Sequence, residues 1–142
     1  MPKNRVVLAA CPPFALPTLE KVLGGYVTLL HVSSLEAAEA ALRTNSRISA
    51  VVCGVHFDES RMYDLLALVK REFPHLSFVC VRVLDAEIPR ISREALRIAS
   101  ESMGASGYVD YPSLIEKHGS DDAEGYLRSH VLARVPSQAS GG

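Results

Sequence analysis

Short, β-branched apolar runs alternate along this chain with longer segments in which apolar residues recur at helical spacing. This alternation restricts the fold more than any other feature, because it is typical of a parallel sheet whose strands are joined by helices. The run at 48–55 is apolar almost throughout, which predicts a central strand covered on both faces. The expected strands are 6–10, 26–32, 48–55, 78–83 and 107–111.

Cap and stop residues delimit the helices expected between these strands. The pattern Ser33-x-x-Glu36 is a capping box that starts an alanine-rich helix. A later helix is expected between a cap at Ser92 and a stop at Gly104. The other helices are expected at 16–23, around 65–69 and from 123 to about 135.

The order of these elements predicts the topology. Right-handed connections make a flavodoxin-like, three-layer α/β/α sandwich the leading fold, with a five-stranded parallel sheet in the order 2-1-3-4-5. We expect a single domain over residues 1–136. Residues 137–142 have nothing to bury, so they are expected to form a loose tail.

Composition excludes several classes of protein. The chain has 142 residues, of which 48% are hydrophobic, and its formal net charge of −1 does not attract nucleic acid or an acidic membrane. No apolar run approaches the roughly 20 residues of a membrane-spanning helix. Three cysteines without a Cys-x-x-Cys pair indicate reduced thiols, and hence a cytoplasmic protein that needs no disulfide.

Three stretches of the sequence are similar to one known family. Residues 104–112, Gly-Ala-Ser-Gly-Tyr-Val-Asp-Tyr-Pro, look like the ending Gly-Ala-x-x-Tyr-Leu-x-Lys-Pro of that family. Residues 5–8 are similar to its opening, and residues 50–55 to its central strand. Over roughly residues 5 to 112 the chain thus resembles the CheY-like receiver domain of bacterial response regulators, which act in two-component signal transduction.

The resemblance also implies where a phosphorylation site would lie. An active receiver holds magnesium with acidic residues after its first strand and accepts phosphate on an aspartate after its third. It grips the phosphoryl oxygens with a hydroxyl and a lysine from its last two strands. Here those positions hold Ala10 and Cys11, Gly54, Arg82 and Tyr111. All five are replaced, so we expect a degenerate pseudo-receiver that is not an enzyme and uses no cofactor.

Arg82 is the most informative of these replacements. Arg82 lies at the carboxyl end of a strand that is expected to be buried, near Gly54. Its guanidinium must therefore pair with an anion or extend to solvent. A salt bridge is the first expectation, and the acidic candidates are Asp58, Glu59 and Asp85. Alternatively, the emptied pocket around Ala10, Cys11, Gly54 and Arg82 binds an anionic metabolite, which would make the protein a small-molecule sensor.

The other cysteines and the histidines predict neither a metal site nor a catalytic pair. Cys53 and Cys80 are expected to pack in the core as small hydrophobic residues. His31 and His56 could join Cys11 as soft ligands, but their separations match no compact zinc pattern. No glycine-rich phosphate loop follows the first strand, which argues against an enzyme of another flavodoxin-like family.

The expected role is therefore phosphorylation-independent protein interaction in bacterial signalling. The resemblance places partner or homodimer contacts on the fourth helix, fifth strand and fifth helix. Arg93 and Arg97 lie one helical turn apart on the expected fourth helix. They form either a solvated charged face or a basic stripe that docks to an acidic partner surface. Tyr108 and Tyr111 are expected on one face of the fifth strand. We expect these four residues to contact a protein partner or a second copy, and no direct contact with nucleic acid or a membrane.

Overall fold

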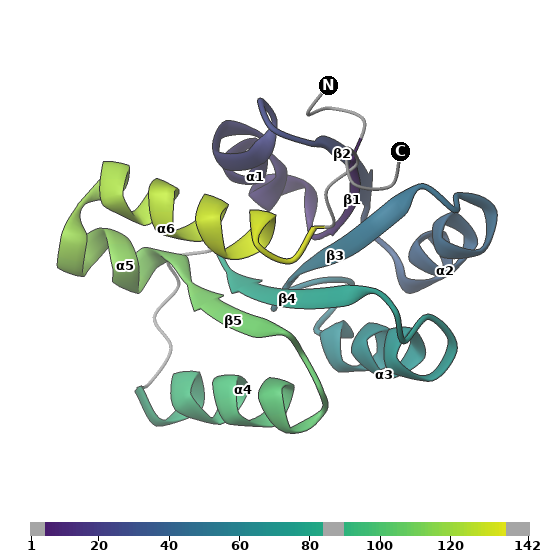
Figure 1. Ribbon diagram of the computed structural model, residues 1–142. Coiled ribbons are helices and arrows are strands. Elements are labelled where there is room, and N and C mark those ends of the chain that lie inside the picture. The colour runs from purple at the N-terminus through teal and green to yellow at the C-terminus, as the bar shows by residue number, and fades with distance from the viewer. Residues whose placement is uncertain (1–4, 84–89, 136–142) are drawn as a thin grey trace.

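A five-stranded parallel sheet forms the centre of the computed structural model, which describes residues 5–83 and 90–135 (Figure 1). Its strand order, β2-β1-β3-β4-β5, confirms the predicted topology. The strands are β1 (Val6–Ala10), β2 (Thr28–Val32), β3 (Ile48–Gly54), β4 (Ser77–Arg82) and β5 (Gly107–Asp110).

Helices cover both faces of this sheet, as the sequence predicts (Figure 1). A short 3-10 turn, η2 (Pro13–Ala15), leads into α1 (Leu16–Leu23), which packs with α6 (Ser120–Leu132) on one face. The helices α2 (Leu35–Thr44) and α3 (Met62–Glu72) pack on the other face. α4 (Arg90–Ser102) lies beside β5, and α5 (Tyr111–His118) lies alongside α6.

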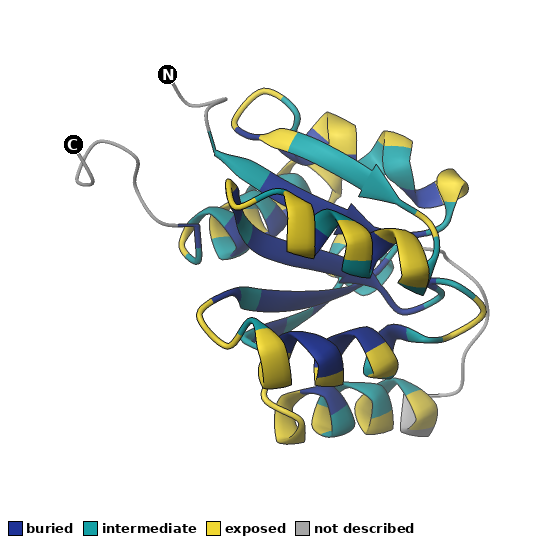
Figure 2. Cartoon of the chain, turned by 90° about the vertical axis from the view of Figure 1, so that its right-hand side faces the viewer, coloured by how far each residue is buried: buried dark blue, intermediate teal, exposed yellow. Residues whose placement is uncertain are grey.

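The core is divided into two layers by the alternation of side chains along the strands. In β1, Val7 and Ala9 face the α1–α6 layer, whereas Leu8 and Ala10 face the α2–α3 layer. The central strands are buried along their length, and exposed residues concentrate on the outer helix surfaces (Figure 2). Cys53 and Cys80 are fully buried in the α2–α3 layer, which confirms their predicted packing role.

Two of the predicted helix caps are wrong by a short distance. The cap of α2 is Ser34 rather than Ser33, because the Ser34 hydroxyl accepts a hydrogen bond from the Ala37 amide at 3.1 Å. Ser92 lies inside α4, which already begins at Arg90. The tail predicted at 137–142 lies outside the described residues.

The sequence patterns predict no helix at residues 111–118, where the structure has α5. Asp110 caps this helix, because its carboxylate accepts a hydrogen bond from the Ser113 amide at 3.3 Å. Gly119, at a φ of 88°, ends α5 and turns the chain directly into α6. The last helix consequently begins at Ser120 instead of the predicted Ala123.

In the described part of the chain, no helix is both long and apolar enough to cross a membrane. The strand register shows which strand ends lie next to one another. Ala10 is level with Cys53, Gly54 with Val81, and Arg82 with Asp110. The carboxyl ends of β1, β3, β4 and β5 therefore meet at the same edge.

Candidate functional site

The carboxyl ends of these strands together form what we call the carboxyl edge of the sheet. The five positions of the expected phosphorylation pocket lie at or just beyond it. Ala10, Gly54 and Arg82 end their strands, and Cys11 and Tyr111 each directly follow a strand. The structure thus brings the backbone of these positions to one region of the fold, as the sequence analysis expected. Their side chains, however, have different surroundings, and each is described in turn below.

The turn that follows β1 packs beside Gly54. A Cβ atom at Gly54 would lie 3.4 Å from Cys11 Cβ and 3.7 Å from Pro12 Cδ. Cys11 is fully buried, and burial raises the pKa of its thiol to about 11, so the thiol stays neutral and is a poor nucleophile or metal ligand. Its backbone is fixed as well, because the carbonyl accepts a hydrogen bond from His31 Nε2 at 2.9 Å.

Arg82 is 2% exposed and forms a salt bridge with Asp110. Its Nε and Nη2 atoms both lie 2.9 Å from Asp110 Oδ1. The expectation that this buried charge is paired is confirmed, and Asp110 on β5, which was not among the candidates, is its carboxylate partner within the described residues. The same Asp110 carboxylate also caps α5, so a single residue links β4, β5 and the helix that follows.

Asp58 and Glu59, two of the three acidic residues proposed for Arg82, have other surroundings. Asp58 accepts a hydrogen bond from the Leu35 amide at 2.7 Å, and thereby holds the start of α2. Arg61 Nη1 lies 3.8 Å from the same carboxylate. Glu59 is exposed, and Asp85 lies outside the described residues. Asp58 therefore has a structural role in joining two loops.

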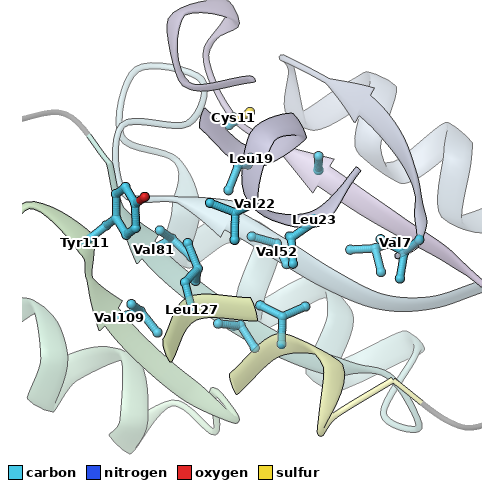
Figure 3. Packing of buried hydrophobic residues seen from close by; sticks show 14 of the residues in the cluster. Val7, Cys11, Leu19, Val22, Leu23, Val52, Val81, Val109, Tyr111 and Leu127 are labelled. Carbon is cyan, nitrogen blue, oxygen red and sulfur yellow. The ribbon is translucent and has the colours of Figure 1, made fainter. Parts of the chain in front are cut away.

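Tyr111 contradicts the prediction that it shares a face with Tyr108. Tyr111 is 6% exposed and packs among Val81, Val109 and Leu127 in the α1–α6 layer (Figure 3). Tyr108 packs against the opposite layer. The reason is the twofold alternation of a strand, since residues three apart point to opposite faces. Tyr111 is a core residue, and it is not available as a surface contact.

The other predicted contact residues line one groove. This groove, of about 500 Å³, lies between α4 and the α5–α6 pair with β5 at its base, and we call it the α4–α5 groove. Arg93, Arg97 and Tyr108 line it, and Tyr111 does not. The other lining residues are Glu94, Val109, Asp110, Ser113, Leu114, Glu116, Lys117 and Tyr126.

The two arginines of this groove differ in their partners. Arg97 pairs within α4, with Nη2 2.7 Å from Glu94 Oε1 and Nη1 3.0 Å from Glu101 Oε1. Arg93 donates from Nη1 to the Ser113 hydroxyl at 3.2 Å. Among the described residues, the buried Arg93 Nε has no hydrogen-bond partner, and neither does the buried Tyr108 hydroxyl. Burial raises the pKa of that hydroxyl to about 12, so it stays protonated as a donor.

Over residues 5–83 and 90–135, no three His, Cys, Asp or Glu side chains lie close enough together to hold a metal ion. No family model matches the chain, and no curated protein matches its sequence. Solved structures do match. The phosphorylated cyanobacterial phytochrome response regulator RcpA superposes with a TM-score of 0.70 at 14% identity, covering 94% of this chain and 99% of that one. The chain has the fold of a response-regulator receiver domain.

Two further receiver-fold structures agree. A response regulator from Chloroflexus aurantiacus matches with a TM-score of 0.65 at 18% identity, covering 92% of this chain and 99% of that one. The orphan response regulator HP1043 of H. pylori matches with a TM-score of 0.63 at 16% identity, covering 91% and 98%. At these identities the receiver likeness concerns the fold, so the chemistry must be argued from the residues described above.

Proposed function

We propose that this protein is a pseudo-receiver, a receiver-fold domain that acts in bacterial signal transduction as an interaction or regulatory module without being phosphorylated. The observation that carries the proposal is the set of described side chains at the carboxyl edge. Cys11 and Pro12 lie against Gly54, and the buried Arg82 is neutralised by Asp110. The described residues at this edge lack the side chains that phosphoryl transfer requires.

The chemistry of the replaced positions supports the same proposal. Glycine at position 54 has no side chain to accept a phosphoryl group. Ala10 has no ligand atom for a hard cation, and the neutral thiol of Cys11 does not suit magnesium. Without a divalent cation, the charge that develops during phosphoryl transfer is not offset.

The α4–α5 groove is the surface that we propose for interaction. It collects three of the four residues expected to make contacts, and its flank includes Tyr126, which is 53% exposed. A protein partner or a second copy of this chain would bind there. The paired state of Arg82 favours this module over a metabolite sensor at the carboxyl edge, because the guanidinium already has a carboxylate.

Chemical phosphorylation tests the proposal. The protein is incubated with acetyl phosphate and Mg²⁺ and its intact mass is recorded, with a phosphorylatable receiver domain as the positive control. We expect no phosphoryl adduct on this chain under conditions that label the control. A stable adduct on Asp58 or Glu59, the acidic residues that follow β3, would overturn the pseudo-receiver proposal.

A cross-link from the groove tests the interaction surface separately. A photoreactive residue replaces Lys117, which is exposed at the groove, and a matched variant carries it at Arg71 on α3. Irradiation in the native host should join the Lys117 variant to a partner or to a second copy, with little product from the Arg71 variant. Equal products from both positions would show that the groove is not a preferred contact surface.

A further inference from the structure

β2 is the outermost strand at one end of the sheet (Figure 1). Within the described ranges its one strand neighbour is β1, to which it runs parallel. The Thr28 amide donates to the Arg5 carbonyl at 2.8 Å, and the Val32 carbonyl accepts a hydrogen bond from the Cys11 amide at 3.1 Å. Every second residue of β2, counted from Thr28, therefore bonds towards β1, because the backbone groups of successive residues in a strand point to opposite sides.

The other residues of β2 direct their backbone groups outward. They are Leu29 and His31, whose amides and carbonyls lie on the side of β2 away from β1. An outer row of donors and acceptors is a template for pairing with a further strand. This row is symmetric about Leu30, which lies between the two residues. A second β2 in the antiparallel direction would therefore place Leu29 of one copy opposite His31 of the other, and each such pair exchanges two hydrogen bonds.

The side chains of β2 do not prevent this pairing. Charged residues, prolines and bulges keep natural sheet edges apart, but the strand sequence Thr-Leu-Leu-His-Val has no proline and no Asp, Glu, Lys or Arg. The imidazole of His31 is already hydrogen-bonded to the Cys11 carbonyl within the chain. Leu29, Leu30 and Val32 are only partly buried, so a second strand can cover more of their apolar surface. By contrast, β5 at the other end of the sheet has α4 beside it.

The charges of α2, which contacts both β2 and α3, face α3. Arg43 forms salt bridges with Glu39 on its own helix and with Glu72 on α3. The Glu36 carboxylate lies 3.8 Å from the guanidinium of Arg61, the residue that precedes α3. The ionic side chains of α2 are thus engaged on the flank away from β2.

The other flank of α2 is small and uncharged. Ala37, Ala41 and Thr44 recur at spacings of four and three, which places them on one side of the helix, turned away from the charged flank. Ala37 and Thr44 are exposed, and Ala41 is partly buried. Because α3 lies against the charged flank, this uncharged flank lies on the side of β2. Short, uncharged side chains allow a second α2 to approach there without repulsion.

We propose that two copies of this chain pair through β2, in antiparallel register about a two-fold axis at Leu30, so that one sheet runs through both copies. The observations favour a second copy over a strand of another protein, because a two-fold interface needs a surface that complements itself. The outer backbone row of β2 meets this need, and its uncharged edge does not repel its own copy. The inference goes beyond the proposed function, since β2 and β5 lie at opposite ends of the sheet and the α4–α5 groove stays open to a partner.

Disulfide trapping tests the pairing and its register on the full chain. In this register Leu30 faces its own copy in a non-hydrogen-bonded pair, with the two Cα atoms about 4.5 Å apart, which is within the range of a disulfide. Leu30→Cys should therefore give a covalent dimer when diamide oxidises the two thiols. The native cysteines are fully buried, so the introduced thiols are the ones that react.

Thr28→Cys is the matched control on the same strand. Thr28 faces Val32 of the other copy, and its own counterpart lies about 13 Å away, which is too far for a disulfide. Thr28→Cys alone should therefore stay monomeric on a denaturing gel. Mixing the Thr28→Cys and Val32→Cys proteins should restore the covalent dimer.

Sedimentation equilibrium measures the dimer without a cross-link. The wild-type chain should dimerise with a dissociation constant at or below about 0.1 mM. Leu30→Lys puts two like charges across the axis and should raise this constant about tenfold or more. Ile98→Lys adds the same charge on α4, where Ile98 is 55% exposed, and should leave the constant within about twofold. Circular dichroism and the thermal midpoint of each variant verify that the fold is intact.

Three results would overturn the inference. They are a wild-type chain that shows no dimer at about 0.1 mM, equal cross-linking of Leu30→Cys and Thr28→Cys, and a dimer that Ile98→Lys weakens while Leu30→Lys does not. The last result would place the contact between copies on the α4 side of the molecule. The proposed function fails by a different sign, a phosphoryl adduct or a cross-link without preference for Lys117.

Discussion

Arg82 and Asp110 form a buried ion pair whose contribution depends on both partners being present. Arg82 is buried, so removing the negative charge of Asp110 leaves the guanidinium without this counter-charge in the interior. Asp110→Asn is the informative change, because asparagine caps a helix as well as aspartate does, so the cap of α5 is kept. We expect a loss of about 3 kcal/mol in the free energy of unfolding, measured by urea denaturation.

Replacing both partners is the control for this prediction. The double variant Arg82→Met, Asp110→Asn removes both charges and keeps the cap of α5, so it should regain most of the stability that Asp110→Asn loses. A loss below about 1 kcal/mol for Asp110→Asn would place this pair with weak surface ion pairs and contradict its assignment as a buried structural link.

His130 predicts a pH dependence of stability. Burial and, to a smaller extent, the nearby Arg134 lower the pKa of this imidazole below its usual value near 6.5. The folded state therefore binds protons less readily than the unfolded state. The contribution of neutral His130 is complete above about pH 6.5 and is lost as the pH falls from there towards the lower pKa of the folded state.

Urea denaturation at several pH values between about 7.5 and 5 measures this effect. Wild type should lose stability over that range, and His130→Gln should show a flatter profile because glutamine does not titrate. The close fit of His130 against Gly107, where a Cβ atom would collide with the ring, makes a folding check of the variant necessary. Identical pH profiles for the two proteins would contradict the assignment.

At the scale of elements, Gly119 controls the junction between α5 and α6. Its φ of 88° combined with a ψ of 164° is a backbone conformation that only glycine adopts readily. Gly119→Ala should therefore destabilise the protein by about 1–3 kcal/mol in urea denaturation, although no neighbouring atom lies within 4 Å of the new methyl group.

Gly125, in the interior of α6, provides the matched control. An added Cβ atom there also meets nothing within 4 Å, but the backbone is helical. Gly125→Ala should therefore stabilise the protein by roughly 0.5–1 kcal/mol, opposite in sign to Gly119→Ala. Equal effects of the two substitutions would show that the backbone conformation at Gly119 does not carry the strain assigned to it.

The elements differ in how far the sequence predicts them. The strands are predictable because their apolar runs are bounded by turn residues, and the sheet order follows from the parallel connections. α5 is missed because it is short and has Pro112 in its first turn. The cap at Asp110 and the stop at Gly119 are signals that could have located it. Ser33 and Ser34 are equally suitable N-cap residues in the sequence. Only the hydrogen bond from the Ala37 amide to the Ser34 hydroxyl identifies Ser34 as the cap.

At the scale of the whole molecule, the sequence predicts the side chains that are missing at the carboxyl edge better than it predicts the ion pair, the groove and the exposed contact residues. Glycine at position 54 provides no side-chain nucleophile at that position in any geometry. The pairing of Arg82 with Asp110 joins residues 28 apart, and the groove depends on the placement of α4 and α5 around β5. Neither contact is visible in local patterns, and the placement of Tyr111 on the contact surface fails for this reason too.

The central claim is that this receiver fold binds partners without phosphorylation, and native mass spectrometry of the protein gently purified from its host tests it most directly. The spectrum is recorded before and after treatment with acetyl phosphate and Mg²⁺. We predict a complex with a protein partner or a second copy that contains the unmodified chain and persists unchanged after treatment. A complex that forms or dissociates together with a phosphoryl adduct on this chain would contradict the account.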